Sequence, residues 1–178
     1  MAVLFTIPLS FSLAQQKAPE KSPEMPVCPM HMPQMPPADA HHEGVVQRGD
    51  EVMGFSHEKT AHHFRLYANG GAIEVTANGA EDTESRDAIR GHLGHIVTMF
   101  AAGNFSAPML IHAQNPPGTE EMKRLRDVIQ YKVETTERGA TIRITTKDAE
   151  ALRAVHEFLR FQIADHQTGD TTEITKAP

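Results

Sequence analysis

The sequence predicts the same order of secondary-structure elements twice, and this repeat constrains the fold more than any other feature of the sequence. In its first occurrence, residues 62–68 and 72–77 alternate between apolar and polar side chains around the turn signal Asn69-Gly70-Gly71, which is typical of a β-hairpin. Residues 83–102 follow with apolar side chains at the spacing of one helix face. We therefore expect a hairpin that leads directly into a helix.

The second occurrence lies in the C-terminal half of the chain. Residues 128–135 and 140–146 alternate around Glu137-Arg138-Gly139, and a helical apolar pattern covers 148–166. Each half has one apolar sheet face and one apolar helix stripe, and these faces can bury each other. The sequence predicts an α+β fold in which two ββα repeats form a four-stranded antiparallel sheet with two helices on one face, preceded by a disordered N-terminal segment.

The first fourteen residues predict export. Residues 2–13 are apolar, and Ser12-Leu13-Ala14 offers small residues for cleavage after Ala14, as in a secretory signal peptide. We expect a periplasmic or secreted protein with no membrane span once the signal peptide (1–14) is removed. The remaining boundaries place a Pro/Met/His-rich disordered segment at 15–43, the ββα-repeat domain at 44–170 and a C-terminal tail at 171–178.

Residues 15–43 hold a cluster of soft metal ligands. Seven of the 12 prolines of the chain lie between Pro19 and Pro37, which favours an extended segment without a core of its own. Methionine has no packing role there, and thioether, thiol and imidazole groups together suit Cu(I), and also Ag(I). The predicted ligands are Met25, Cys28, Met30, His31, Met32 and Met35, and His41, His42 and Glu43 could add a Cu(II) or Zn(II) site.

The run Cys28-Pro29-Met30-His31 resembles the Cys-Pro-Met-His core of short heavy-metal-binding segments in bacterial copper and silver efflux proteins. The resemblance covers these four residues, and it implies copper as the favoured cofactor, with zinc as the alternative. Cys28 is the one cysteine of the chain, so an internal disulfide is excluded. Its thiol is then free, a link to a second copy, or a ligand.

The predicted domain has histidines of its own that could form a second site. His92 and His95 lie one turn apart on the first predicted helix, and His62 is expected to face them from the strand, with His57 or His112 reaching in from a loop. His62, His92 and His95 are therefore candidate metal ligands. The alternative is that His92, on the apolar stripe, is a hydrogen-bonded core residue, as we expect for His156 on the second helix.

Longer stretches resemble a group of small exported bacterial proteins. The likeness rests on residues 53–60, on His62-His63-Phe64 and on residues 158–170, and it spans roughly 50–170. Some members of that group carry the name aspartate carbamoyltransferase, but this sequence lacks the phosphate-binding Ser-Thr-Arg-Thr motif of that transferase. The resemblance therefore implies export and leaves the transferase activity without support.

Composition and motifs narrow the function classes. With 23 acidic residues against 17 Lys and Arg, the net charge of −6 disfavours nucleic-acid binding. The sequence contains no nucleophile elbow, P-loop or dinucleotide fingerprint, and no Cys-x-x-Cys-His for covalent haem attachment. We expect a metal-binding protein rather than an enzyme, with a metal ion, a second copy or another periplasmic protein as partner. The alternatives are a binding or structural module whose histidines only pack, and a His-dependent metalloenzyme.

Overall fold

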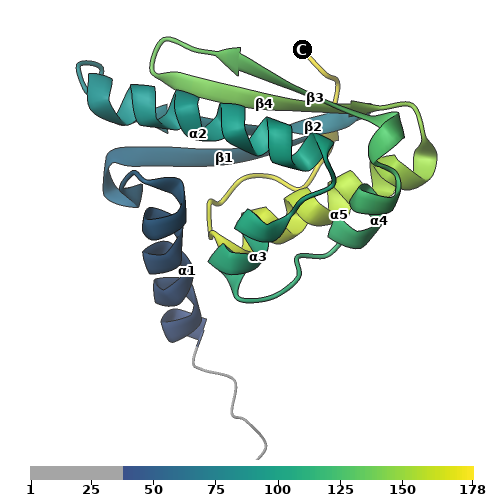
Figure 1. The fold of residues 1–178 in the computed structure, drawn as a ribbon, viewed down its shortest axis with the longest axis horizontal. Coiled ribbons are helices and arrows are strands. Elements are labelled where there is room, and N and C mark those ends of the chain that lie inside the picture. Colours follow the sequence, from purple (N-terminus) through teal and green to yellow (C-terminus); the bar gives the residue numbers. More distant parts are fainter. Residues whose placement is uncertain (1–37) are drawn as a thin grey trace, which may run out of the picture. The chain divides into compact units, whose positions relative to one another are not determined.

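The computed structural model describes residues 38–178, which form an α+β fold (Figure 1). The α+β class that the sequence predicts is thus confirmed. Five strands form one mixed sheet in the order β3-β4-β2-β1-β5. The strands are β1 (Thr60–Tyr67), β2 (Gly70–Ala77), β3 (Ile129–Thr135), β4 (Gly139–Thr146) and β5 (Ile174–Thr175); the helices are α1 (Ala38–Met53), α2 (Thr83–Ala101), α3 (Ser106–His112), α4 (Thr119–Arg124) and α5 (Ala149–Asp165), with short 3-10 turns at His57–Lys59 and Arg126–Val128.

The first hairpin forms where the sequence predicts it, because its turn carries glycine. Gly70 has a φ of +150°, and a Cβ atom there would lie 1.9 Å from the carbonyl oxygen of Ile144, so only glycine fits this approach to β4. The register pairs Phe64 of β1 with Ile73 of β2, and Ile73 with Ile142 of β4. These three side chains therefore share the inner face of the sheet.

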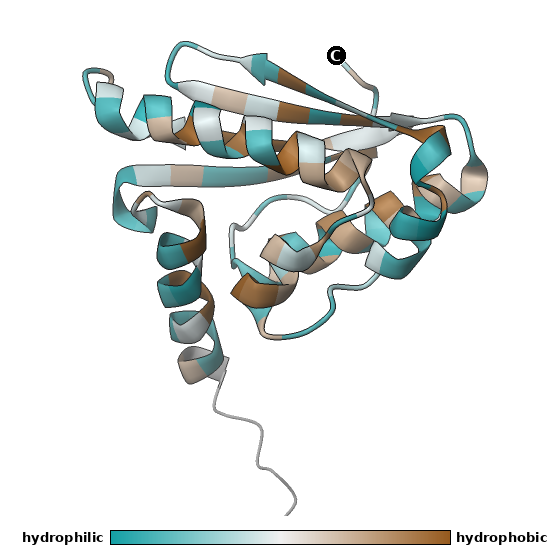
Figure 2. Ribbon diagram, viewed as in Figure 1, coloured by the Kyte–Doolittle hydropathy of each residue, from teal (hydrophilic) through white to brown (hydrophobic). Residues whose placement is uncertain are grey.

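The core lies between this inner face and two amphipathic helices. Asp82 and Asp148 accept hydrogen bonds from first-turn amides of α2 and α5, and so fix where both helices begin. α2 packs mainly on β3 and β4, whereas α5 packs on β1 and β2, and Figure 2 shows apolar residues recurring between polar ones along both helices. Buried Phe100 and Phe158 join the two helices edge to face, with ring centroids 5.9 Å apart. No helix of residues 38–178 is long and apolar enough to cross a membrane.

The sheet differs from the predicted set of four strands. The fifth strand, β5, runs parallel to β1 and makes the sheet mixed. It comes from residues 171–178, the predicted tail, where a strand of two residues is too short to give a periodic pattern. Two further helices, α3 and α4, lie in sequence between the first hairpin-helix run and the second.

The folded part also begins earlier than Gly44, the predicted boundary. α1 starts at Ala38, directly after the last proline of the Pro-rich segment, where backbone amides again become available for helical hydrogen bonds. Its Val45 is fully buried, and Arg48 Nε donates to the carbonyl oxygen of Ile111 in α3 at 2.8 Å. Residues 38–43, predicted as part of the Pro/Met/His-rich segment, are therefore helical.

Candidate functional site

Four histidines line one cavity between the sheet and the helices. His62 comes from β1, His92 from α2, His112 from the end of α3 and His166 from the C-cap of α5. The cavity has a volume of about 60 Å³ and is partly open to solvent. Apart from Gln162, its remaining walls are apolar, and they include Phe64, Ile96, Phe100, Ile142 and Phe158.

The periodicity of each element directs these side chains to the cavity. His62 lies two residues before Phe64 on β1 and shares its inward direction, because alternate strand residues point to the same face. Gln162 and His166 lie four residues apart at the end of α5, and this spacing puts them on the same side of the helix. The inner sheet face and the last turn of α5 therefore supply facing polar groups.

Aromatic stacking fixes the positions of the rings. The ring of His166 stacks on that of His62, with centroids 5.9 Å apart and planes within 3°, and also on Phe64 at 5.5 Å. Phe55 stacks on His62 at 6.0 Å and meets His92 edge to face at 5.7 Å. Three imidazoles are thus embedded among aromatic rings, which is a poor environment for a positive charge without a counter-ion.

Burial keeps these three imidazoles uncharged at neutral pH. Loss of hydration lowers the pKa of His62 to about 4 and that of His166 to about 3, because it penalises the imidazolium form. The pKa of His92 falls to about 4 for the same reason, with a further contribution from neighbouring His95. The neutral ring keeps a nitrogen lone pair, which can accept a hydrogen bond or bind a metal ion.

Asp165 holds the fourth histidine in a different way. Its Oδ2 lies 2.5 Å from Nδ1 of His112, and its Oδ1 lies 2.9 Å from Nε2 of His41 on α1. Burial alone would raise the pKa of Asp165, but the hydrogen bonds from His112 and His41 outweigh it and lower the pKa. Nε2 of His112 lies 3.0 Å from Oε1 of Gln162. Both ring nitrogens of His112 therefore have oxygen partners, one from Asp165 and one from Gln162.

Two buried polar atoms at the cavity have no hydrogen-bond partner within residues 38–178. They are Nε2 of His62 and Nε2 of Gln162. Gln162 is only 4% exposed, so bulk solvent does not replace the missing partner. An unsatisfied buried polar group costs about 1–3 kcal/mol, and native structures usually satisfy such groups with protein, water or a ligand. The cavity therefore presents unused hydrogen-bonding capacity.

The structure brings together two of the three metal ligands that the sequence predicts for the domain. His62 and His92 both contact Phe55, whereas His95 is exposed on α2. In the part of the chain that the structure describes, no group of three or more His, Cys, Asp or Glu side chains is placed to hold a metal ion. The ligands predicted in the N-terminal segment lie outside the described residues: Met25, Cys28, Met30, His31, Met32 and Met35.

The remaining histidines have structural partners. His41 and His42, expected in an extended segment, lie on α1 and contact the side chain and the carbonyl oxygen of Asp165, at 2.9 and 3.3 Å. His156 is buried, as its place on the apolar stripe predicts, and its Nε2 lies 2.9 Å from the carbonyl oxygen of Tyr67 and 3.0 Å from that of Gly70. It ties α5 to the turn of the first hairpin.

His166 and Gln162 were not among the predicted site residues. Their four-residue spacing on a predicted helix indicates a shared face. The amino-acid pattern does not show that this face meets His62, because that contact joins residues more than a hundred positions apart in the chain.

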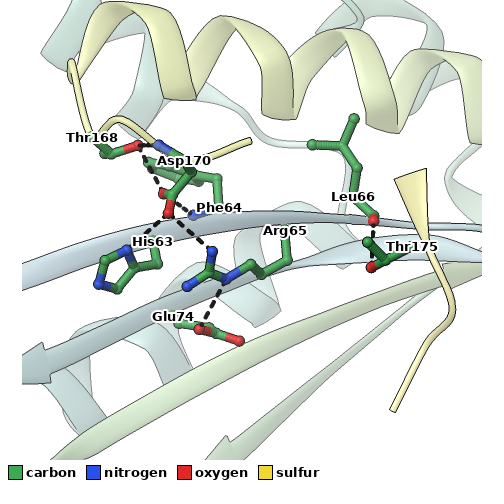
Figure 3. Close-up of polar contacts among 8 residues, drawn as sticks. All are labelled: His63, Phe64, Arg65, Leu66, Glu74, Thr168, Asp170 and Thr175. Carbon is green, nitrogen blue, oxygen red and sulfur yellow. Dashed lines mark hydrogen bonds and ion pairs between the residues drawn. The ribbon is translucent and has the colours of Figure 1, made fainter. Parts of the chain in front are cut away.

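A second polar cluster, on β1 and the C-terminal segment, is a structural anchor (Figure 3). Oδ1 of Asp170 lies 3.0 Å from both Nδ1 of His63 and a guanidinium nitrogen of Arg65, and Oδ2 accepts from the amide of Phe64 at 3.0 Å and the hydroxyl of Thr168 at 2.8 Å. Burial would raise the pKa of Asp170, but these hydrogen bonds outweigh it and lower the pKa. Both carboxylate oxygens are used within the fold, so this cluster fastens the segment that leads to β5.

Comparison of the chain with protein-family models, with curated proteins and with solved structures finds no match.

Proposed function

We propose that the protein is an exported metal-binding protein that takes up Cu(I) through residues 25–35. The observation that carries this proposal is the presence of four Met, one Cys and one His within that short stretch of sequence. Soft thioether and thiol ligands favour Cu(I) over hard cations such as Mg²⁺ and Ca²⁺. Copper is the proposed cofactor, zinc the weaker alternative, and the periplasm or the exterior the proposed location.

The folded domain has a supporting role in this proposal. α1 begins at Ala38, three residues after Met35, so an ion held in the segment lies close in sequence to the fold. We interpret β1-β2-α2 and β3-β4-α5 as two ββα units that present the segment to a partner protein or a second copy. The neutral imidazoles of His62 and His92 retain lone pairs and are candidates for a further metal contact.

A second candidate function is a binding module that does not use metal. Two observations favour it: His62, His92 and His166 are packed by aromatic rings, and the cavity that they line has two buried polar atoms without partners. The third alternative, a metalloenzyme, needs several ligands around an ion with an open position, and no such group occurs among residues 38–178.

Competition for Cu(I) tests the first candidate. A colorimetric Cu(I) chelator is titrated against the full chain and against a variant with Cys28→Ser, Met30→Ala, His31→Ala and Met32→Ala. We expect the variant to bind Cu(I) at least about tenfold more weakly, because it loses both sulfur and imidazole ligands. The matched control is Met109→Ala, which removes a methionine that is 41% exposed on α3. Equal affinities of variant and control would refute the assignment of copper to this segment.

A further inference from the structure

A hydrogen-bond chain runs from a carboxylate into the cavity and stops at an unused donor. Oδ2 of Asp165 lies 2.5 Å from Nδ1 of His112, and Nε2 of His112 lies 3.0 Å from Oε1 of Gln162. Gln162 faces His112 with its amide oxygen, so its NH₂ group points the other way. Nε2 of Gln162 lines the cavity and has no hydrogen-bond partner within residues 38–178. Gln162 is only 4% exposed.

The β1 side of the cavity offers a complementary atom. His62 is neutral, so only one of its ring nitrogens carries a proton. With the proton on Nδ1, the buried Nε2 is an acceptor, and it too has no partner within residues 38–178. The ring cannot turn freely, because it is sandwiched between Phe55 and His166. The cavity thus holds one fixed donor and one fixed acceptor among apolar walls.

We propose that this cavity binds a small uncharged molecule that carries a hydroxyl group on a short apolar body. A hydroxyl oxygen accepts a hydrogen bond from Gln162, and its proton is donated to His62, so a single group satisfies both atoms. The inference names a ligand class for the second candidate function. It does not depend on copper binding by residues 25–35.

Size and charge define this class. An engineered apolar cavity of about 150 Å³ takes up benzene, so a volume of about 60 Å³ suits a body of a few non-hydrogen atoms. A charged ligand would be buried beside neutral imidazoles and apolar walls such as Phe100 and Phe158, which offer no compensating charge. Water offers the same hydroxyl hydrogen bonds to these two atoms, but an alkyl group gains in addition from leaving solvent for the apolar walls.

Titration by NMR with three small probes of equal size tests the proposal. 2-Propanol, acetone and acetate each have four non-hydrogen atoms, but only 2-propanol is an uncharged molecule with a hydroxyl group. Each is added to the full chain at neutral pH, and the imidazole Cε1–H signals of His62 and His166 are followed. We expect saturable shifts with 2-propanol at millimolar concentrations, weaker binding of acetone, which cannot donate, and the weakest binding of acetate.

Two variants locate the binding. His62→Phe keeps a ring between Phe55 and His166 but removes the acceptor, and Gln162→Met keeps a similar volume but removes the donor. Each variant is expected to weaken binding of 2-propanol about three- to tenfold, which is the usual contribution of one hydrogen bond. The control variant, exposed His95→Ala, leaves the affinity for 2-propanol unchanged. If Gln162→Met does not fold, the affinity of His62→Phe alone tests the proposal. Three results would overturn the proposal. The absence of saturable shifts would mean that the cavity holds only water, and tighter binding of acetate than of 2-propanol would contradict the uncharged class. Unchanged affinity of His62→Phe for 2-propanol would place the ligand elsewhere.

Discussion

Acidification should destabilise this protein well above the pH at which its carboxylates titrate. The perturbation is a fall in pH from 7.5 to 5.5, and the main responsible groups are the imidazoles of His62 and His166. Half-buried His92, whose pKa is also lowered, adds to the loss of stability. Their folded-state pKa values are lowered from 6.5 to about 4 and about 3. Below pH 6.5 the unfolded chain binds protons at these imidazoles, whereas the folded chain does not. Stability therefore falls as the pH decreases towards the folded-state pKa values.

The size of the effect follows from the linkage relation. Each such imidazole lowers the free energy of unfolding of the protein by about 1.4 kcal/mol for every pH unit below the unfolded-state pKa of the imidazole. At pH 5.5 the two groups together therefore cost about 3 kcal/mol, a large part of the 5–15 kcal/mol that is typical of a domain. The carboxylates of Asp165 and Asp170, whose pKa values are lowered, contribute stability that is lost only below about pH 4.

Urea unfolding at a series of pH values measures this loss. His166→Phe keeps the stacking on His62 and Phe64 but cannot titrate, so it should lower the loss between pH 7.5 and 5.5 by about a third to a half. His95→Gln, at an exposed position, should leave the pH dependence unchanged. A free energy of unfolding that is constant over this range in the unmodified protein would refute the reasoning, and so would an equal loss in His166→Phe.

Two further changes test the fold. Asp170→Asn should lower the free energy of unfolding by about 2 kcal/mol in urea at pH 7, because an amide NH₂ group cannot accept hydrogen bonds from the donors that surround this carboxylate. Exposed Glu173→Gln is the control, and equal stability of the two variants would contradict the anchoring role. Gly118→Ala should lower the melting temperature, at a cost of about 2 kcal/mol or more, because Gly118 has a φ of +82° and the new Cβ would lie 2.2 Å from the carbonyl oxygen of Ala154. Gly91→Ala, in the middle of α2 with open space around it, should raise the melting temperature instead, and shifts of the same sign in both would contradict this account.

Local chemistry made much of the fold predictable. The hairpins follow from glycine at the turns, and the starts of α2 and α5 follow from capping carboxylates at Asp82 and Asp148. The role of His156 follows from its place on an apolar stripe. Each of these signals lies within a few residues of the feature that it specifies.

Features that depend on distant contacts were not predictable in this way. α1 is held by Arg48, His41 and His42 through groups of α3 and α5, and its own apolar pattern is weak. β5 exists because β1 leaves an edge to which the chain returns after Asp170. The cavity combines residues from a strand, from the middle of α2 and from the ends of two other helices, and no single stretch of sequence contains that combination.

Elemental analysis tests copper binding by the N-terminal segment most directly. The full chain and a variant that lacks residues 15–37, which leaves α1 intact, are purified from periplasm of copper-supplemented cells, and copper and zinc are measured per chain. The account predicts copper in the full chain and little in the shortened one, with equal melting temperatures for the two metal-free proteins. Equal copper content in both proteins, or none in either, would contradict it.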